Sequence, residues 1–223
     1  MRFVNREKSS GFKTSQTLNL KSQTLHLTPY TLNLKPSKMN WKKLSSEYIL
    51  KHKYFTARKD VCEMPDGKIV PAYYVVELPP SVCALAITEE GKALLAKQYR
   101  HPIEETLIEL PGGFVDAGED PSTAIARELL EETGHRFSSI QFVGKVSANP
   151  GVLSGYTHLY LAMGGKKIAA QSLDHNEEIE VLQMPLEELR GMLLRNEIVQ
   201  ALHVSCLLYA FQKLDEMERQ FVD

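Results

Sequence analysis

The stretch that decides how this chain is read runs Gly113-Phe-Val-Asp-Ala-Gly-Glu119-Asp-Pro-Ser-Thr-Ala-Ile-Ala-Arg127-Glu128-Leu-Leu-Glu131-Glu132-Thr-Gly134. Asp120 is a favourable N-cap, and Pro121 suits the first helical position, where its missing N–H costs nothing. Gly134 suits the left-handed residue that follows the last helical turn. The stretch therefore predicts one short helix between Asp120 and Gly134.

Three glutamates of this predicted helix lie close together. Glu128 and Glu132 are four residues apart and share one face of the helix, and Glu131 borders that face. Like charges at this spacing repel one another, and a bound divalent cation removes that penalty. Taken alone, the pattern is typical either of a solvated acidic face or of a site for Mg²⁺.

The segment before the helix favours the second interpretation. Leu110-Pro-Gly-Gly113 predicts a tight turn whose two glycines allow close approach of the backbone to a ligand. Glu119 precedes the helix, within reach of Arg127 or of a metal site. Arg127 is four residues from Glu131, which is ion-pair spacing.

These positions resemble the Nudix box: a glycine, a glutamate, and then Arg-Glu-apolar-x-Glu-Glu-x-Gly-apolar. The matching residues are Gly113, Glu119, Arg127, Glu128, Leu129, Glu131, Glu132 and Gly134. His135 stands where the family has an apolar residue, which puts the local packing in doubt more than the metal site. The resemblance implies an α/β fold, the Nudix α/β/α sandwich with a mixed sheet, plus a small N-terminal antiparallel sheet. It also implies hydrolysis of a nucleoside diphosphate linked to another group, with Mg²⁺ or Mn²⁺.

The resemblance also implies a role for each residue of the box. Glu128 and Glu132 are the principal carboxylate ligands of the metal, the Gly112 carbonyl is a further ligand, and Glu131 shares a metal and joins the catalytic candidates. Arg127 orients Glu131 and Glu119 from behind the ligands.

Features outside the box resemble the ADP-ribose pyrophosphatase subgroup. Gln98-Tyr-Arg-His-Pro102 precedes the box as it does in those enzymes, and Pro150 lies fifteen residues beyond His135, where that subgroup has its marker proline. Asn176-Glu-Glu-Ile-Glu-Val181 resembles the loop that carries their catalytic glutamate. The resemblance covers residues 51–214 and implies a homodimer formed through N-terminal strands.

Several side chains are candidates for the substrate site, each with an ordinary alternative. Glu177 is the first choice for the base that activates water and Glu178 the second, although such a pair is equally typical of a solvated turn. Arg100 suits phosphate, because a guanidinium matches phosphate oxygens bidentately. Tyr73 or Tyr74 stacks on adenine or packs in a core. Pro150 is also compatible with an ordinary turn, and Glu109 lies near the metals or accepts from backbone amides.

Charge divides the chain unevenly. The first 40 residues carry seven Lys/Arg and one acid, whereas the remainder carries 19 basic and 27 acidic residues. We expect a flexible basic tail over 1–40 and a Nudix domain over 41–223, with dimerisation strands at about 41–80. Met39 is a candidate alternative translation start, which would leave most of this tail untranslated. The acidic domain disfavours a nucleic-acid partner, although the tail leaves that possibility open.

The remaining patterns predict the other elements and the setting. Three cysteines without a Cys-x-x-Cys pattern, no secretory leader and no long apolar run indicate a cytoplasmic protein without a membrane partner. Strands are expected over 51–78 with a turn at 64–67, and over 81–88, 93–99, 140–147, 158–163 and 178–183. Helices are expected over 186–194 and 198–214.

Two other functions compete with ADP-ribose hydrolysis. GDP-sugar hydrolases share the fold and the box, so they are the nearest alternative. A non-catalytic Nudix-fold nucleotide-binding or regulatory protein is an alternative of a different class. Every carboxylate of the box is present here, which disfavours it.

Overall fold

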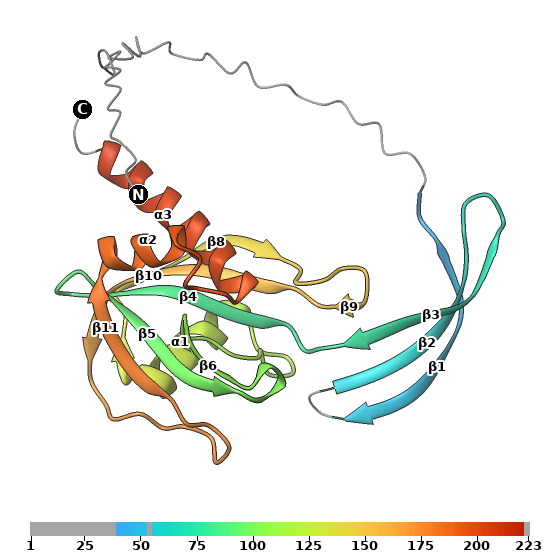
Figure 1. Ribbon diagram of the computed structural model, residues 1–223, viewed down its shortest axis with the longest axis horizontal. Helices are drawn as coiled ribbons and strands as arrows, with labels where there is room; N and C mark the ends of the chain where they lie inside the picture. Colours follow the sequence, from blue (N-terminus) through green and yellow to red (C-terminus); the bar gives the residue numbers. More distant parts are fainter. Residues whose placement is uncertain (1–38, 53–54, 221–223) are drawn as a thin grey trace, which may run out of the picture. The chain divides into compact units, whose positions relative to one another are not determined.

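The computed structural model describes residues 39–52 and 55–220, which form two sheets and three α-helices (Figure 1). The larger sheet is mixed and has the strand order β11-β5-β4-β10-β7, with β6 paired to β5 and β8 paired to β10. Strands β4 and β10 run parallel, whereas β5 is antiparallel to β4, β6 and β11. Its strands are β4 (Ser81–Thr88), β5 (Lys92–Arg100), β6 (Glu105–Glu109), β7 (His135–Arg136), β8 (Ser139–Val146), β10 (Thr157–Lys167) and β11 (Glu180–Pro185).

Strand β4 shows why this sheet has helices on both faces. Successive side chains of a strand point to opposite faces. The even-numbered residues from Val82 to Ala86 pack in one apolar cluster with α1 (Pro121–Thr133). The odd-numbered residues from Cys83 to Ile87 pack in another, with α2 (Leu186–Leu194) and α3 (Ala201–Gln220). The result is the α/β/α sandwich predicted for this family, with α1 on one face and α2 and α3 on the other (Figure 1).

Helix α1 has the ends that its sequence predicts. The Asp120 side chain accepts a hydrogen bond from Ser122 N–H, and Pro121 opens the first turn. Gly134 has the left-handed conformation (φ 71°), and its N–H donates to the Leu130 carbonyl. Both caps are formed by residues next to the helix in the sequence, so local sequence indicates where the helix begins and ends.

The smaller sheet has the order β1-β2-β3-β9. It contains β1 (Lys42–His52), β2 (Phe55–Glu63), β3 (Ile69–Glu77) and β9 (Leu153–Ser154). The first three strands are antiparallel, as predicted, and β9 adds two residues parallel to β3. Strand β9 follows the Pro150 turn, so this pairing connects that turn to the N-terminal sheet.

Several boundaries differ from the sequence expectations. Strand β1 begins at Lys42, nine residues before the expected start, and α3 spans Ala201–Gln220 rather than 198–214. The short strands β6, β7 and β9 and the 3-10 turn His101–Ile103 were not predicted. The predicted tail falls almost wholly in residues 1–38, outside the described residues, and stays a prediction. Within the described part, no helix is both long and apolar enough to span a bilayer.

His135, the departure from the box, occupies a packed position. It is buried, and its Nδ1 lies 2.7 Å from the Thr133 carbonyl oxygen. Its ring also contacts that of Phe137. The imidazole therefore fills the place of the usual apolar residue, and one of its two ring nitrogens has a local partner.

Candidate active site

The turn at residues 110–113 is fixed to strand β4. Val82 N–H donates to the Gly113 carbonyl, and Ala84 N–H donates to the Pro111 carbonyl. Gly112 has φ +152°, and a Cβ built on it would lie 2.2 Å from the Val82 carbonyl oxygen. Only glycine therefore lets this turn lie so close to the sheet.

Glu132 extends from α1 towards this turn. Its Oε2 accepts a 2.9 Å hydrogen bond from Gly112 N–H, and the residue is 5% exposed. Burial raises the pKa of Glu132 to about 8; the Gly112 hydrogen bond opposes this rise, and the negative charges of Glu128 and Glu177 add to it. A nearby cation would therefore stabilise the ionised form of this carboxyl.

Glu128 lies one turn earlier on the same face and contacts the same loop. A Cβ on Gly113 would meet the Glu128 carboxylate at 2.5 Å, so the glycine leaves room for this side chain. Burial raises the pKa of Glu128, the Arg127 charge lowers it, and the charges of Glu131 and Glu177 raise it further. Glu128 and Glu132 are thus two partly desolvated carboxyls on one helix face, as predicted.

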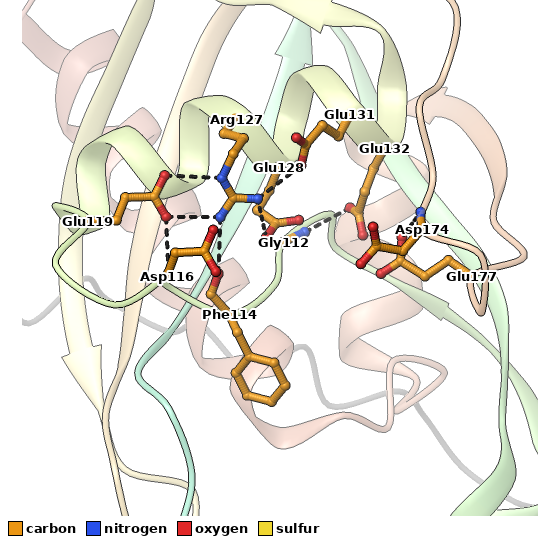
Figure 2. Close-up of polar contacts among 10 residues, drawn as sticks. All are labelled: Gly112, Phe114, Asp116, Glu119, Arg127, Glu128, Glu131, Glu132, Asp174 and Glu177. Atoms are coloured by element: carbon orange, nitrogen blue, oxygen red, sulfur yellow. Dashed lines mark hydrogen bonds and ion pairs between the residues drawn. The ribbon is translucent and has the colours of Figure 1, made fainter. Parts of the chain in front are cut away.

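Arg127 connects the remaining carboxylates of the box (Figure 2). Its guanidinium donates to both Glu119 oxygens at 3.1 and 3.0 Å, and to Glu128 and Glu131 at 2.9 Å each. It also donates to the Phe114 carbonyl. The Glu119 hydrogen bond is the largest cause that raises the pKa of Arg127, and the same contact lowers the pKa of Glu119. Arg127 thus contacts both residues that it was predicted to orient, Glu119 and Glu131, and its role stays a prediction.

Glu177 lies beside Glu132, on the loop that precedes β11 (Figure 2). Its backbone N–H donates to the Asp174 carbonyl, and its Oε2 accepts from Asp174 N–H at 3.1 Å. Its charge also contributes to the raised pKa of both Glu128 and Glu132. The structure thus brings the first-choice base close to the glutamates of α1, whereas no hydrogen bond of the Glu178 side chain joins it to the described residues.

Arg100 is held by a buried carboxylate. Glu109 is 1% exposed, and its Oε2 accepts from Arg100 Nη2 at 2.6 Å and from Gln98 at 2.9 Å. The positive charge of Arg100 acts on Glu132, which places it at this site. Glu109 Oε1 is buried without a hydrogen-bond partner among the described residues. The Glu109 carboxylate therefore binds Arg100 and Gln98, and it accepts no hydrogen bond from a backbone amide of the described residues.

The predicted substrate residues of the N-terminal sheet lie elsewhere. Tyr73 donates a 2.8 Å hydrogen bond to the Gly151 carbonyl, which brings it to the turn of Pro150. Its ring meets that of Trp41 edge to face, beside a cavity of about 280 Å³. Tyr74, its neighbour on the strand, is 59% exposed. The structure joins Tyr73 to the Pro150 turn, and among the described residues no hydrogen bond joins either tyrosine to the glutamates of α1.

The donor set suits a hard divalent cation that also binds substrate. Within the described residues, no three His, Cys, Asp or Glu side chains form a ready-made metal cage. Mg²⁺ commonly binds one or two carboxylates and completes its octahedron with water and phosphate. The buried Glu132 and the half-buried Glu128 both have a raised pKa, and they lie beside a carbonyl that only glycine can present, which matches that requirement.

Sequence reasoning missed two residues that support this site. His203 of α3 is buried, and its Nδ1 accepts from Leu110 N–H at 3.2 Å. Gln171 donates to the Glu132 carbonyl at the end of α1. Neither residue belongs to a local motif, so only the tertiary structure reveals these contacts.

Comparison with known proteins identifies the class. The NUDIX domain model matches residues 77–203, more than half of the chain, and the chain therefore belongs to the Nudix family and is a Nudix hydrolase. The model of the nucleoside diphosphate sugar hydrolase N-terminal domain matches residues 41–76, which form most of the smaller sheet.

Three individual proteins are similar to this chain. The methanol dehydrogenase activator of Bacillus methanolicus is 33% identical over 66% of this chain and 80% of its own length. The ADP-ribose pyrophosphatase of Bacillus subtilis strain 168 is 31% identical over 72% of this chain and 86% of its own. A solved structure titled ADP compounds hydrolase covers 82% of this chain and 98% of its own, with a TM-score of 0.70 at 22% identity. At that identity the solved structure supports the fold alone.

Proposed function

We propose that this protein hydrolyses the pyrophosphate bond of ADP-ribose or a similar nucleoside diphosphate sugar, releasing AMP and ribose 5-phosphate from ADP-ribose. The observation that carries the proposal is the group formed by Glu128, Glu132 and the Gly112 turn, with Glu177 beside it. The Bacillus subtilis relative named ADP-ribose pyrophosphatase supports the substrate class.

Each residue has a defined task in this reaction. Glu128, Glu132, Glu131 and the Gly112 carbonyl would hold Mg²⁺ or Mn²⁺. When bound, such an ion would offset the negative charge of the pyrophosphate and lower the pKa of water. Arg127 and Glu119 keep Glu128 and Glu131 in place. Glu177 accepts the proton of the attacking water, the water oxygen bonds to phosphorus, and the bridging P–O bond breaks.

The recognition of the substrate is divided between two places. Arg100 binds phosphate oxygens while Glu109 fixes the position of its guanidinium. Tyr73 and the Pro150 turn form the wall on which the nucleoside rests, with Tyr74 as an alternative.

A substrate panel with purified protein and Mg²⁺ tests the assignment. ADP-ribose should turn over faster than GDP-mannose, and a chelator should abolish the reaction. Equal or faster turnover of GDP-mannose would favour the GDP-sugar alternative. Because one relative is named as an activator of a dehydrogenase, absence of any turnover would favour the non-catalytic regulatory alternative. Glu177→Gln should lower kcat at least tenfold, with Glu178→Gln as the matched control.

We also propose that a second copy of the chain covers the N-terminal sheet. Strand β1 is an edge strand whose residues are all exposed, and exposed apolar edges favour association. Its large exposed apolar residues are Leu44, Tyr48, Ile49 and Leu50. Light scattering should give the mass of a dimer for wild type and for an Ile168→Glu control, which changes an exposed residue outside this sheet. Ile49→Glu should shift the mass towards a monomer.

A further inference from the structure

The C-terminal end of α1 is completed by the segment that follows β10. The last carbonyls of a helix have no partner within the helix. Here the Glu131 carbonyl accepts from Ser172 N–H at 2.8 Å, and the Glu132 carbonyl accepts from Gln171 Nε2 at 2.7 Å. The backbone of the helix that carries the proposed metal ligands is therefore bound directly to the beginning of the loop that carries Glu177.

The same amide group also reaches the far end of that loop. Gln171 Nε2 donates a second hydrogen bond, at 3.1 Å, to the carbonyl of Ile179, which is buried just before β11. Both acceptors are carbonyl oxygens, so they require the NH₂ group at this position and fix the orientation of the amide. One side chain thus joins the end of α1 to both ends of the loop 172–178.

The loop between these two ends has little else to hold it. The Glu177 hydrogen bonds to Asp174 lie within the loop. Among the described residues, the one hydrogen bond from 172–178 to the rest of the chain runs from Ser172 N–H to Glu131. The position of Glu177 relative to Glu128 and Glu132 therefore depends strongly on Gln171.

We propose that Gln171 is a positioning residue that holds the Glu177 loop against the C-terminal end of α1. This inference rests on the proposed function, in which Glu177 accepts the proton from water. Gln171 touches neither substrate nor metal in this scheme. Its two donors set the distance between the base and the carboxylates that bind metal, so its loss lowers the fraction of molecules in which Glu177 is correctly placed.

Gln171→Met tests the proposal, because methionine has a similar length and no donor. The expected kcat is about tenfold lower, the loss that corresponds to about one hydrogen bond, while KM and the half-saturating Mg²⁺ concentration stay within about twofold. Gln171→Glu should lose more, since a carboxylate faces two carbonyls. Gln183→Met is the matched control: Gln183 is exposed on β11 and its side chain makes no hydrogen bond with the described residues.

Two further measurements separate positioning from a general structural effect. If Gln171 acts through Glu177, Gln171→Met should have no added effect on kcat in a Glu177→Gln background; independent, multiplying losses would overturn the proposal. Hydrogen exchange gives a readout without substrate: the Ser172 and Glu177 amides should exchange several-fold faster in Gln171→Met and unchanged in Gln183→Met. Unchanged exchange would overturn the positioning role of Gln171 even in an active enzyme. Faster exchange in a protein that is inactive on the substrate panel would support the positioning role and reject the proposed function.

Discussion

Glu132 should make the stability of the metal-free protein depend on pH. Its pKa rises from the ordinary 4.5 to about 8 in the folded chain, chiefly through burial. A carboxyl with a raised folded pKa stabilises the folded state fully below its unfolded pKa, and this stabilisation is lost as the pH rises through the folded pKa. The free energy of unfolding of the metal-free protein should therefore fall between about pH 4.5 and about pH 8. At about 1.4 kcal/mol per pKa unit, the loss has an upper limit of roughly 5 kcal/mol.

Denaturant unfolding in the presence of a chelator measures this effect. Glu132→Gln stays neutral, and its amide oxygen can still accept from Gly112 N–H. Between about pH 5.5 and pH 8.5, wild type should lose several kcal/mol more of its free energy of unfolding than this variant. Glu131→Gln is the control, because the Glu131 side chain is 42% exposed and its variant should follow wild type. If the free energies of unfolding of wild type and Glu132→Gln change in parallel with pH, burial of the Glu132 charge does not destabilise the folded protein.

Added Mg²⁺ should reverse the same loss. A metal ligand must be ionised, so Mg²⁺ binding competes with the proton on Glu132 and strengthens as the pH rises. The Mg²⁺-dependent increase in Tm should therefore be larger at about pH 8.5 than at about pH 5.5. Glu132→Gln should show a smaller increase at both values. An equal increase in this variant would remove Glu132 from the metal site.

Three more predictions concern residues that support the site. Arg127→Leu leaves its carboxylates without their shared donor, so kcat/KM should fall about 10- to 100-fold with an unchanged circular dichroism spectrum; normal turnover would exclude the orienting role. Gly112→Ala should lower the free energy of unfolding by more than about 2 kcal/mol, because its Cβ would overlap Val82. Gly118→Ala is its control, with φ +82° but no atom within 4 Å, and should cost about 1 kcal/mol; equal losses in denaturant would contradict the steric argument. Asp120→Ala should cost about 1 kcal/mol and keep its activity, and an unchanged melting curve would contradict the cap.

The elements that the sequence predicted best depend on local chemistry. The N-cap at Asp120 and the left-handed Gly134 set both ends of α1, and a continuous apolar run set Ser81–Thr88. Strands β7 and β9 were missed because each has two residues and exists only through pairing with a distant segment. Strand β9, for example, consists of two residues whose partners Val76 and Glu77 lie more than 70 residues earlier. No periodic pattern can develop over two residues.

The same division applies to the site. The motif predicted Glu128, Glu132 and Arg127 because their spacing on one helix places them together in any fold that keeps the helix. Gln171 and His203 act on backbone groups of distant segments, and such contacts leave no recurrent spacing in the sequence. The Glu177 loop lies between these cases. Its resemblance to the family's catalytic loop suggested a base, whereas the hydrogen bonds at its two ends are visible only in the structure.

The charge balance of the site explains why its parts need one another. Two guanidiniums, Arg127 and Arg100, face six carboxylates: Glu109, Glu119, Glu128, Glu131, Glu132 and Glu177. Each arginine is already engaged, so the excess negative charge adds to the effect of burial, which is the main cause of the raised pKa of Glu128 and Glu132. A pyrophosphate alone would be repelled by such a site. Under the proposed function, a divalent cation would remove the repulsion among the carboxylates and attract the phosphates, so bound metal should strengthen substrate binding.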